Sequence, residues 1–590
     1  MTMKRIKYLI ILLITVGFTS CLDVLDKEPL DVISDVVVWS DPSLVDAYLN
    51  DIYYRADFMY GGPGKDDVDL GLIASMGGES RNYGAWQRPY AASTAIITET
   101  GAHSALQYWK YNVIRDVNYF IEQMELTVDL DADYVSSRVA EARFLRAYIY
   151  FRMVALYGGV PIITVPQSPD APTEELYVAR NSEKECYDFV ISECDAIAEL
   201  LLTETDATTN LGRATKWTAM ALKSRAAVYA ASIAKYGTQQ LDGLLGFQSS
   251  DVNAYAQKAY DASKKIINES GHALYQGNGD AVENFQKIFY DESGANREVI
   301  FAERYDFALG MGHSFSNKAM PDGFTKGWGS NWNVFYETVE LFEWQDGRPG
   351  NSISRNDLTY SKSGIEYSAE ELFHTRDPRF RASVFYPETP WQGSRVLFHS
   401  ATWVDGKKLN KGVAADGWPY KAPNRNTVKT GAHVKKRVDE GIVKPLGGED
   451  NADYIAFRLG EIYLNLAEAA FYLDKNGEAL DAINVLRARA EMPAKTEVNE
   501  DIIQNERRVE LFWEDHSWFD LRRWRIAAEV LDGTRFQALK YDYNYETKKY
   551  QIKFANAEGV TRVFQERHYY LPLGIGRITD NPNLVENPGY

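Results

Sequence analysis

The sequence predicts a mainly α-helical protein, in which an irregular array of four helix pairs carries one loop-rich, partly β insertion. Two observations lead to this fold class. Several long segments place apolar residues three and four positions apart, which is the spacing of an amphipathic helix. Between residues 276 and 450 this spacing stops, and Gly, Asn, Ser and Trp surround short apolar runs.

Composition narrows the classes of function. The chain has 590 residues and a formal net charge of −19, from 64 Lys plus Arg against 83 Asp plus Glu. So acidic a chain lacks the basic face that nucleic acid requires, and charge alone does not draw it to anionic lipid. Its 38 Tyr and 13 Trp are amphipathic rings that suit sugar faces and wet interfaces.

The first 20 residues have the pattern of a signal peptide. Three cations, Lys4, Arg5 and Lys7, precede a short apolar run over residues 8–18, too short to span a bilayer. Two small residues follow, and Cys21 comes directly after them, as in the lipobox of bacterial lipoproteins. We expect cleavage before Cys21, attachment of diacylglycerol and palmitate to this residue, and anchoring by several acyl chains.

Cysteine use predicts no disulfide. After Cys21 only Cys186 and Cys194 remain, in a helical pattern. Eight residues of helix rise about 12 Å, beyond the roughly 7 Å between Cα atoms that a disulfide bridges. We therefore expect both to be small core residues.

Four helix pairs are expected. Residues 108–124 pair with 140–158, residues 182–201 pair with 213–237, and a third pair opens at Asp251. The fourth consists of residues 453–477 and 478–490. Gly158, Gly159 and Pro161 end the first pair, because these residues do not continue a helix.

The second helices of the first two pairs resemble each other. Aligning Ala142 with Ala221 also matches Arg146 with Arg225 and Tyr150 with Tyr229. Small residues at recurrent positions let helices approach closely, as in stacked hairpins of the tetratricopeptide type. The repeat distance of 79 residues makes any such array irregular.

Five ordered stretches make the chain similar to the SusD/RagB family of outer-membrane nutrient-binding lipoproteins. They are ARFLRAYIYFRMVALYGGVPI (142–162), RDPRF (376–380), FRLGEIYLNLAEA (457–469), IIQNERRVELFWEDHSWFDLRRW (502–524) and YYLPLGIGRITDNPNLVENPGY (569–590). The resemblance implies a SusD-like fold with four tetratricopeptide-like pairs. It also implies a partner, a SusC-like TonB-dependent outer-membrane transporter, that receives the captured nutrient.

These patterns divide the chain into five predicted regions. They are a signal peptide (1–20), a lipidated N-terminus with the first ligand-side loops (21–103), helix pairs one to three (104–275), the glycan-side insertion (276–450), and the fourth pair with the C-terminal family region (451–590).

Charge-rich motifs favour a structural role over catalysis. Residues 506–523 alternate acids and bases at three- and four-residue spacing, which supports helices and orients their packing. Arg376, Asp377 and Arg379 form a turn whose charges we expect to lock one lobe to another.

Metal, cofactor and catalytic motifs are not found in the sequence. There is no HExxH, no Cys/His cluster, no phosphate-binding GxxxxGK[ST] loop and no GxSxG elbow. Acidic Asp66, Asp67 and Asp69 could form a calcium loop, but such loops are usually solvated. Among 83 acids nothing selects the carboxylate pair of a glycosidase. We predict no cofactor, no metal and no enzyme activity.

Sugar binding has positive support. Sugar rings stack their C–H faces on aromatic side chains in loops, while Asn, Asp, Arg and Gln bind the hydroxyl groups. Two loop segments, 79–87 and 305–332, have this composition, and the family resemblance points to the same segments. The predicted ligand-binding residues are Arg81, Asn82, Tyr83, Trp86, Tyr305, Trp328 and Trp332. Further candidates are Trp391, Trp403 and Trp418. Buried packing is the alternative for any single ring, so the prediction concerns the two segments.

The sequence therefore predicts a lipid-anchored protein facing the cell exterior, which binds a glycan and delivers it to the transporter. Two alternatives from other classes stay open. One is a lid of the transporter that binds peptide or nothing, and the other is a cell-surface glycoside hydrolase.

Overall fold

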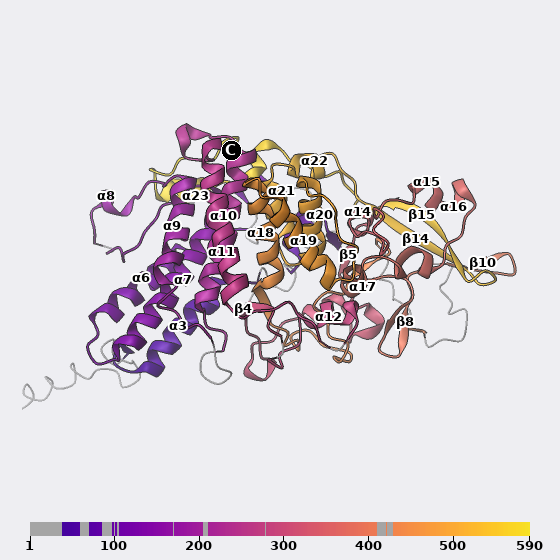
Figure 1. The fold of residues 1–590 in the computed structure, drawn as a ribbon, viewed down its shortest axis with the longest axis horizontal. Coiled ribbons are helices and arrows are strands. Elements are labelled where there is room, and N and C mark those ends of the chain that lie inside the picture. The colour runs from indigo at the N-terminus through magenta and orange to yellow at the C-terminus, as the bar shows by residue number, and fades with distance from the viewer. Residues whose placement is uncertain are drawn as a thin grey trace, which may run out of the picture.

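The structure, a computed structural model, describes residues 38–59, 70–84, 97–98, 101–102, 106–168, 170–204, 211–277, 279–294, 296–399, 401–409, 420–421 and 429–590 (Figure 1). Its main body is a row of packed helices. In spatial order they are α3 (Pro42–Ala56), α6 (Tyr111–Leu126), α7 (Ala132–Tyr157), α9 (Glu183–Ile197), α10 (Lys216–Tyr236), α11 (Val252–Glu269), α18 (Leu459–Tyr472) and α19 (Asn476–Arg489), each in contact with the next. The predicted mainly α-helical fold class is confirmed.

Local sequence sets the helix ends. The Asp131 side chain accepts hydrogen bonds from the first backbone amides of α7. Ser182 and Glu185 form a capping box at the start of α9. Gly158 ends α7 with φ +73°, and a Cβ there would lie 2.3 Å from Leu245. Only glycine fits both that backbone angle and that close approach.

The predicted fourth pair is present as α18 and α19, which pack on each other. Among the described residues, the third pair has no second long helix before the insertion. Instead α11 packs on α10 and on α18, which follows it only after the whole insertion. Figure 1 shows magenta α11 standing beside orange α18. The insertion therefore leaves the array between two neighbouring helices, and periodicity carries no signal for which distant helix covers an apolar face.

Equivalent arginines tie successive pairs together. Arg146 on α7 lies 2.9 Å from Glu193 on α9, and Arg225 on α10 lies 2.6 Å from Glu461 on α18. These two arginines were matched in the sequence repeat, and each reaches an acid on the neighbouring helix. The two equivalent helices therefore share an ion pair with a neighbouring helix as well as a packing surface.

The insertion is built on short strands. Strand β4 (Val299–Glu303) pairs antiparallel with β13 (Tyr454–Arg458), which closes its base. One sheet has the order β1-β5-β12-β6, with β1 (Ser80–Asn82), β5 (Trp332–Val334), β12 (His433–Val434) and β6 (Val384–Phe385). Small sheets join β7 (Thr389–Trp391), β8 (Ser394–Val396) and β11 (Tyr420–Lys421), and β2 (Ile97–Thr98) with β3 (Gly101–Ala102).

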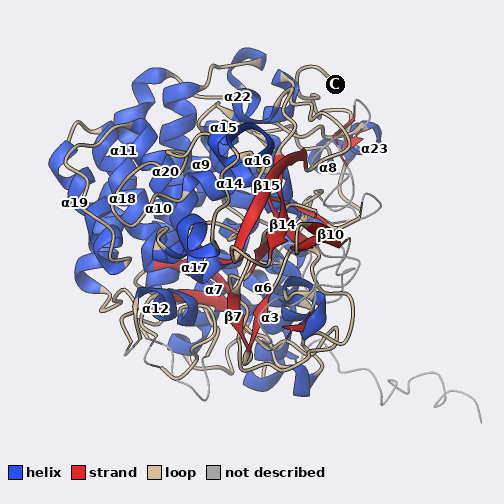
Figure 2. Cartoon of the chain, turned by 90° about the vertical axis from the view of Figure 1, so that its right-hand side faces the viewer, coloured by secondary structure: helices blue, strands red, loops and turns tan. Residues whose placement is uncertain are grey.

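A further sheet crosses the predicted boundary at residue 450. Strand β14 (Gln537–Asn544) pairs with β15 (Lys549–Asn556) and, in parallel, with β9 (Ala401–Val404), which pairs with β10 (Lys407–Leu409). Figure 2 shows β10, β14 and β15 together, away from α11, α18 and α19. The C-terminal region is therefore structurally part of the insertion as well as of the helical array.

Short helices connect these elements. They are α4 (Leu72–Met76), α8 (Thr173–Leu176), α12 (Ala281–Lys287), α13 (Phe315–Ala319), α14 (Tyr336–Leu341), α15 (Arg355–Leu358), α16 (Tyr360–Ser363), α17 (Pro378–Ser383), α20 (Glu500–Glu510), α21 (Ser517–Arg523), α22 (Ala527–Leu531) and α23 (Ile575–Asp580).

The charge-rich motifs form a buried ion-pair network. Arg379 contacts both Glu506 and Glu510 of α20, so the 376–379 turn does lock the insertion to the array. Arg458 of β13 contacts Glu510 and Glu298. Most of these partners are far apart in sequence, which corrects the expectation of pairing along one helix. The network joins elements because each buried charge requires a partner.

Cys186 and Cys194 are free and buried in α9, as predicted. Among the residues that the structure describes, no helix has the length and apolar character needed to cross a membrane.

Candidate functional site

The two predicted ligand segments lie side by side. Strand β1 pairs antiparallel with β5, with Asn82 opposite Trp332 and Arg81 opposite Asn333. Just beyond the pairing, the Tyr83 amide donates a 2.7 Å hydrogen bond to the Asn331 carbonyl. Residues about 250 positions apart in the chain thereby form one continuous strand pair, which is buried and leads into Tyr83 on one side and into the Trp328 loop on the other.

A buried aromatic cluster holds this segment from below. The ring of Trp332 lies 4.8 Å from Phe315 and 4.7 Å from Trp513, centroid to centroid. The Trp332 indole donates to the Leu70 carbonyl, and the Trp513 indole donates to Ser80 Oγ. Trp332 is only 1% exposed. It has no face for a sugar and supports the site instead, which corrects its predicted role.

Three more predicted residues are also covered by protein. Arg81 donates to the backbone carbonyls of Asn82, Tyr83 and Ala557 and so braces β1. The Asn82 side chain is buried, and the Tyr305 ring packs edge-on against His313 at 4.9 Å. The predicted direct contacts of Arg81, Asn82 and Tyr305 with a ligand are therefore corrected to supporting roles in this structure.

Trp328 has the opposite environment. Its side chain is 72% exposed, in a loop between α13 and β5. Its backbone is left-handed, with φ +67°, and Gly329 next to it has no room for a Cβ, which would lie 2.6 Å from the Met320 carbonyl. A left-handed backbone is strained for a bulky residue, at a cost of order 1–3 kcal/mol. The loop therefore holds a large ring in water at an energetic cost.

Tyr83 is the second accessible ring. It is half-buried, and the Lys429 ammonium lies 4.8 Å from its ring centroid. The Lys318 ammonium stands in a similar relation to Trp328, at 5.7 Å. Each accessible ring of the site thus has a lysine beside it.

Two further loops lie beside the Trp328 loop. Pro445 accepts hydrogen bonds from the Lys326 amide and the Asn317 side chain, and His313 pairs its backbone with Asp450. These loops expose other apolar side chains, namely Phe307, Leu309, Val443 and Leu446. The exposed apolar surface around Trp328 therefore comes from three separate loops.

Several predicted residues lie outside the described residues: Cys21, Asp66, Asp67, Asp69, Trp86 and Trp418. Of the additional tryptophans, Trp391 is 1% exposed and packs in the core, whereas Trp403 is half-buried.

Sequence reasoning missed the basic side chains of the site. Lys318, Lys429 and Lys540 come from α13, the segment before β12, and β14. Lysines are common and these three are far apart in the chain, so only their convergence in space marks them.

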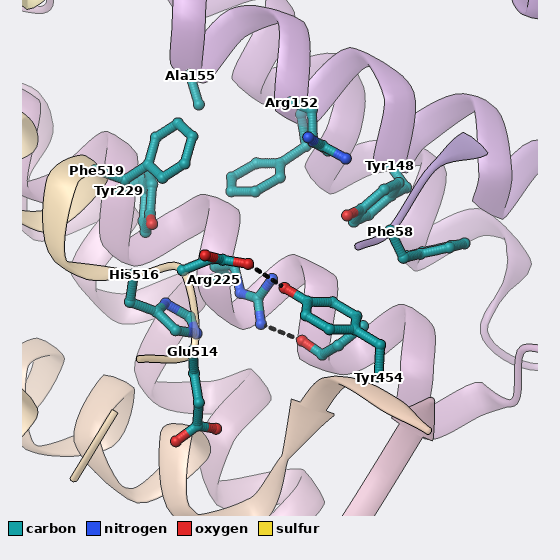
Figure 3. A pocket seen from close by; sticks show the side chains of 13 residues that line it. Phe58, Tyr148, Arg152, Ala155, Arg225, Tyr229, Tyr454, Glu514, His516 and Phe519 are labelled. Atoms are coloured by element: carbon teal, nitrogen blue, oxygen red, sulfur yellow. Dashed lines mark hydrogen bonds between the residues drawn. The ribbon is translucent and has the colours of Figure 1, made fainter. Parts of the chain in front are cut away.

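An internal cavity lies away from this surface, between α7, α10, β13 and residues 514–519 (Figure 3). Its volume is about 50 Å³, which suits one or two water molecules and not a sugar ring. Arg225 donates to the Ala456 carbonyl, and the Tyr454 hydroxyl lies 3.2 Å from Asp515. Burial raises the pKa of Asp515 to about 6. This cavity belongs to the polar core.

A larger hollow of about 570 Å³ lies between α14 and α20 and is lined by acids. Glu340 is paired with Arg355, and Glu343 with Lys495 and Arg487. In the part of the chain that the structure describes, no three His, Cys, Asp or Glu side chains gather as a metal site would require.

Two family models match the chain. One, the SusD family, matches residues 297–590, and the other, described as starch-binding associating with outer membrane, matches residues 74–228. The chain belongs to the SusD/RagB family. Together the two matches include β1, Tyr83, Trp328 and β5, so the paired segments of the site lie within regions that the family models cover.

SusD-like relatives match over almost the whole of both chains. A SusD-like protein of Bacteroides ovatus is 23% identical, over 99% of this chain and 97% of that protein. The crystal structure of a SusD-like protein from Bacteroides fragilis superposes with a TM-score of 0.69, at 24% identity, over 96% of this chain and 100% of that one. A structure titled laminarin binding SusD-like protein gives 0.61 at 19% identity, over 93% and 100%.

Proposed function

We propose that this protein is a lipid-anchored outer-membrane protein, facing the cell exterior, that binds a glycan across Trp328 and Tyr83. It passes the glycan to a SusC-like TonB-dependent transporter and catalyses no reaction itself. The observation that carries the binding proposal is the exposure of Trp328, held in a left-handed loop beside the paired β1 and β5 segments.

The physical argument starts from the exposed ring. A Trp ring in water is unfavourable, and a strained backbone adds to that cost, so an arrangement of this kind is typical of a binding surface. Flat C–H faces of sugars cover an indole well. Tyr83 adds a second ring, joined to the Trp328 loop through the hydrogen bond from Tyr83 to Asn331.

The membrane and transport parts rest on sequence and family. Cys21 follows an apolar run and two small residues, as a lipidation site does. One matching family model carries the description of association with the outer membrane. Partner contact through the helical array would leave the Trp328 surface free for a ligand.

The acids with the largest upward pKa shifts have structural partners. Burial raises the pKa of Glu79 to about 8, and Glu79 accepts a hydrogen bond from the Trp513 amide. Burial likewise raises the pKa of Glu303 and of Asp453 to about 7. Glu303 accepts from the Met59 amide and Asp453 from the Tyr305 amide. Each of these carboxyl groups thus accepts a hydrogen bond from the backbone of another segment and holds that segment in place. A structural role for these acids supports a binding protein over a hydrolase.

Calorimetric titration of the full-length protein in mild detergent tests the proposal. The ligands are a panel of neutral and acidic polysaccharides and a peptide digest. We expect heat with one glycan class, and a 10- to 100-fold weaker affinity in Trp328→Gly, as for the loss of an aromatic anchor. Glycine relieves the left-handed backbone, so this variant removes the ring without straining the loop.

Other results would contradict the proposal. Heat only with the peptide digest would favour peptide capture, and no heat at all would favour a lid that binds nothing. Shortening of a bound polysaccharide by the purified protein would revive a hydrolase. Unchanged glycan affinity in Trp328→Gly would exclude the ring as the binding surface.

A further inference from the structure

Lysines flank both accessible rings of the site. The Lys318 ammonium lies 5.7 Å from the Trp328 ring and the Lys429 ammonium 4.8 Å from the Tyr83 ring. Lys540 extends the row, since its ammonium donates a 3.0 Å hydrogen bond to the Lys429 carbonyl. These lysines therefore lie beside the same two rings that the proposed glycan covers.

Two of these lysines have no acid opposite them. Within the described ranges, no carboxylate oxygen lies within 4.0 Å of the Lys318 or Lys429 ammonium. Asp542, two positions from Lys540 on β14, is already held by Lys408 and Lys553 at 2.6 and 2.7 Å. The protein as a whole has a net charge of −19, with acidic residues in excess. The surface beside these two rings differs from that average, because Lys318 and Lys429 there have no acidic partner among the described residues.

The positive charges also act on one another. Burial lowers the pKa of Lys429, and the nearby Arg81 charge lowers it further. Burial lowers the pKa of Lys540 to about 8, with contributions from Lys429 and Arg81. Partly buried like charges raise the free energy of the empty site, and a bound anion would lower it.

We propose that the glycan is an acidic polysaccharide, whose carboxylate or sulfate groups contact Lys318, Lys429 and Lys540 while its sugar rings stack on Trp328 and Tyr83. This inference rests on the proposed glycan binding and specifies its ligand class.

The geometry fits a polymer that carries regular negative charges. Cations stand at both rings and come from separate elements, so a polymer with several anionic groups can contact a lysine at each ring. An ammonium group is a compact charge without the fixed two-pronged geometry of a guanidinium group. It therefore donates hydrogen bonds to a carboxylate or a sulfate equally well. Charge-assisted hydrogen bonds are about twice as strong as neutral ones, so the charges would dominate specificity.

The test compares neutral and acidic polysaccharides on the full-length protein. Laminarin, starch and xylan form the neutral set, alginate and polygalacturonate carry carboxylates, and carrageenan and sulfated laminarin carry sulfates. Affinities are measured at 50 and 300 mM NaCl. We expect binding to at least one acidic member, at least tenfold tighter than to any neutral one and weaker at high salt.

Substitutions then locate the charges. Lys429→Met and Lys318→Met should each weaken acidic-glycan binding about tenfold, with unchanged thermal unfolding. Lys258→Met on α11 is the matched control, because Lys258 is half-buried like the two site lysines and lies 5.0 Å from a tyrosine ring, that of Tyr255. The carboxylate and sulfate sets distinguish the two sources of negative charge.

The outcomes separate this inference from the proposed function. Binding confined to neutral members, or equal affinity for laminarin and its sulfated form, overturns the acidic-ligand inference and leaves glycan binding intact. Binding to neither set overturns both. An equal loss in Lys258→Met and Lys429→Met overturns the assignment of the site.

Discussion

Arg225 of α10 donates hydrogen bonds of 2.6 Å to each carboxylate oxygen of Glu461 on α18, across 236 residues of sequence. Both side chains are buried. The chain leaves the helical array after α11 and returns to it at α18. This ion pair joins the returning helix α18 to α10 and so stabilises the array on the far side of the insertion. A buried pair of this geometry favours one arrangement of distant helices over others.

Breaking that pair should be costly. Glu461→Gln or Arg225→Met is expected to lower the free energy of unfolding by about 3–5 kcal/mol, because the remaining buried charge loses its partner. Urea unfolding followed by circular dichroism measures this. The double variant Arg225→Met with Glu461→Gln should cost less than the sum of the two single changes.

The exposed pair of Lys216 with Glu199 is the control for this prediction. Glu199→Gln should leave the urea unfolding midpoint almost unchanged, because the Glu199 carboxylate is solvated with or without its partner. Equal effects of Glu199→Gln and Glu461→Gln would show that burial does not matter here.

The two site tryptophans should differ in what they do. Trp332→Ala is expected to lower the free energy of unfolding by about 3–5 kcal/mol, because it opens a cavity between Phe315 and Trp513. Trp328→Gly is expected to leave stability equal or slightly higher, since it removes an exposed ring and backbone strain. Thermal unfolding of both variants checks this, and a larger loss in Trp328→Gly would contradict the burial of Trp332.

Glu79 should make stability depend on pH. Its pKa is about 8 in the folded protein, raised by burial from an ordinary value of 4.5. Above pH 4.5 the unfolded chain releases a proton that the folded protein retains up to about pH 8. This group therefore lowers the free energy of unfolding as pH rises from about 5 to 8.

Glu79→Gln cannot ionise, so its stability relative to the wild type should rise between pH 5 and pH 8. Urea unfolding at both pH values measures the difference. Glu122→Gln, at an exposed position of α6, serves as control and should show no such trend. A constant difference for Glu79→Gln would mean that Glu79 is ionised in the folded protein throughout.

The proposed anchor predicts a change of location. Cys21→Ala should move the protein from the membrane fraction to the soluble fraction, because the acyl chains have no attachment point. Fractionation followed by immunoblotting checks this, with Cys186→Ala as the control, a buried cysteine that should not affect location. Membrane retention of Cys21→Ala would contradict lipidation as the anchor.

The positions of most long helices could be predicted, because the apolar spacing of a helix depends only on residues close together in the sequence. Apolar spacing located α6, α7, α9, α10, α11, α18 and α19, and the 79-residue repeat anticipated that Arg146 and Arg225 occupy equivalent places. The pairing of α11 with α18 was not predictable, since an amphipathic face shows that a helix is covered and not by what.

The site was predictable only in part. Loop composition singled out the segments around Tyr83 and Trp328, and these segments do lie side by side through β1 and β5. Composition does not report burial, so Trp332 and Trp328, four positions apart, were given the same role. The structure makes one 1% exposed and the other 72% exposed.

The sequence by itself determined the helical class, the family and the segments rich in aromatic side chains, because periodicity and motif order are properties of neighbouring residues. Only the tertiary structure decided which rings remain accessible and which lysines stand beside them. Lys540 contacts Lys429, the Lys429 amide donates to Asn333, and the Asn331 amide donates to the Lys318 carbonyl, and such contacts depend on how distant elements pack.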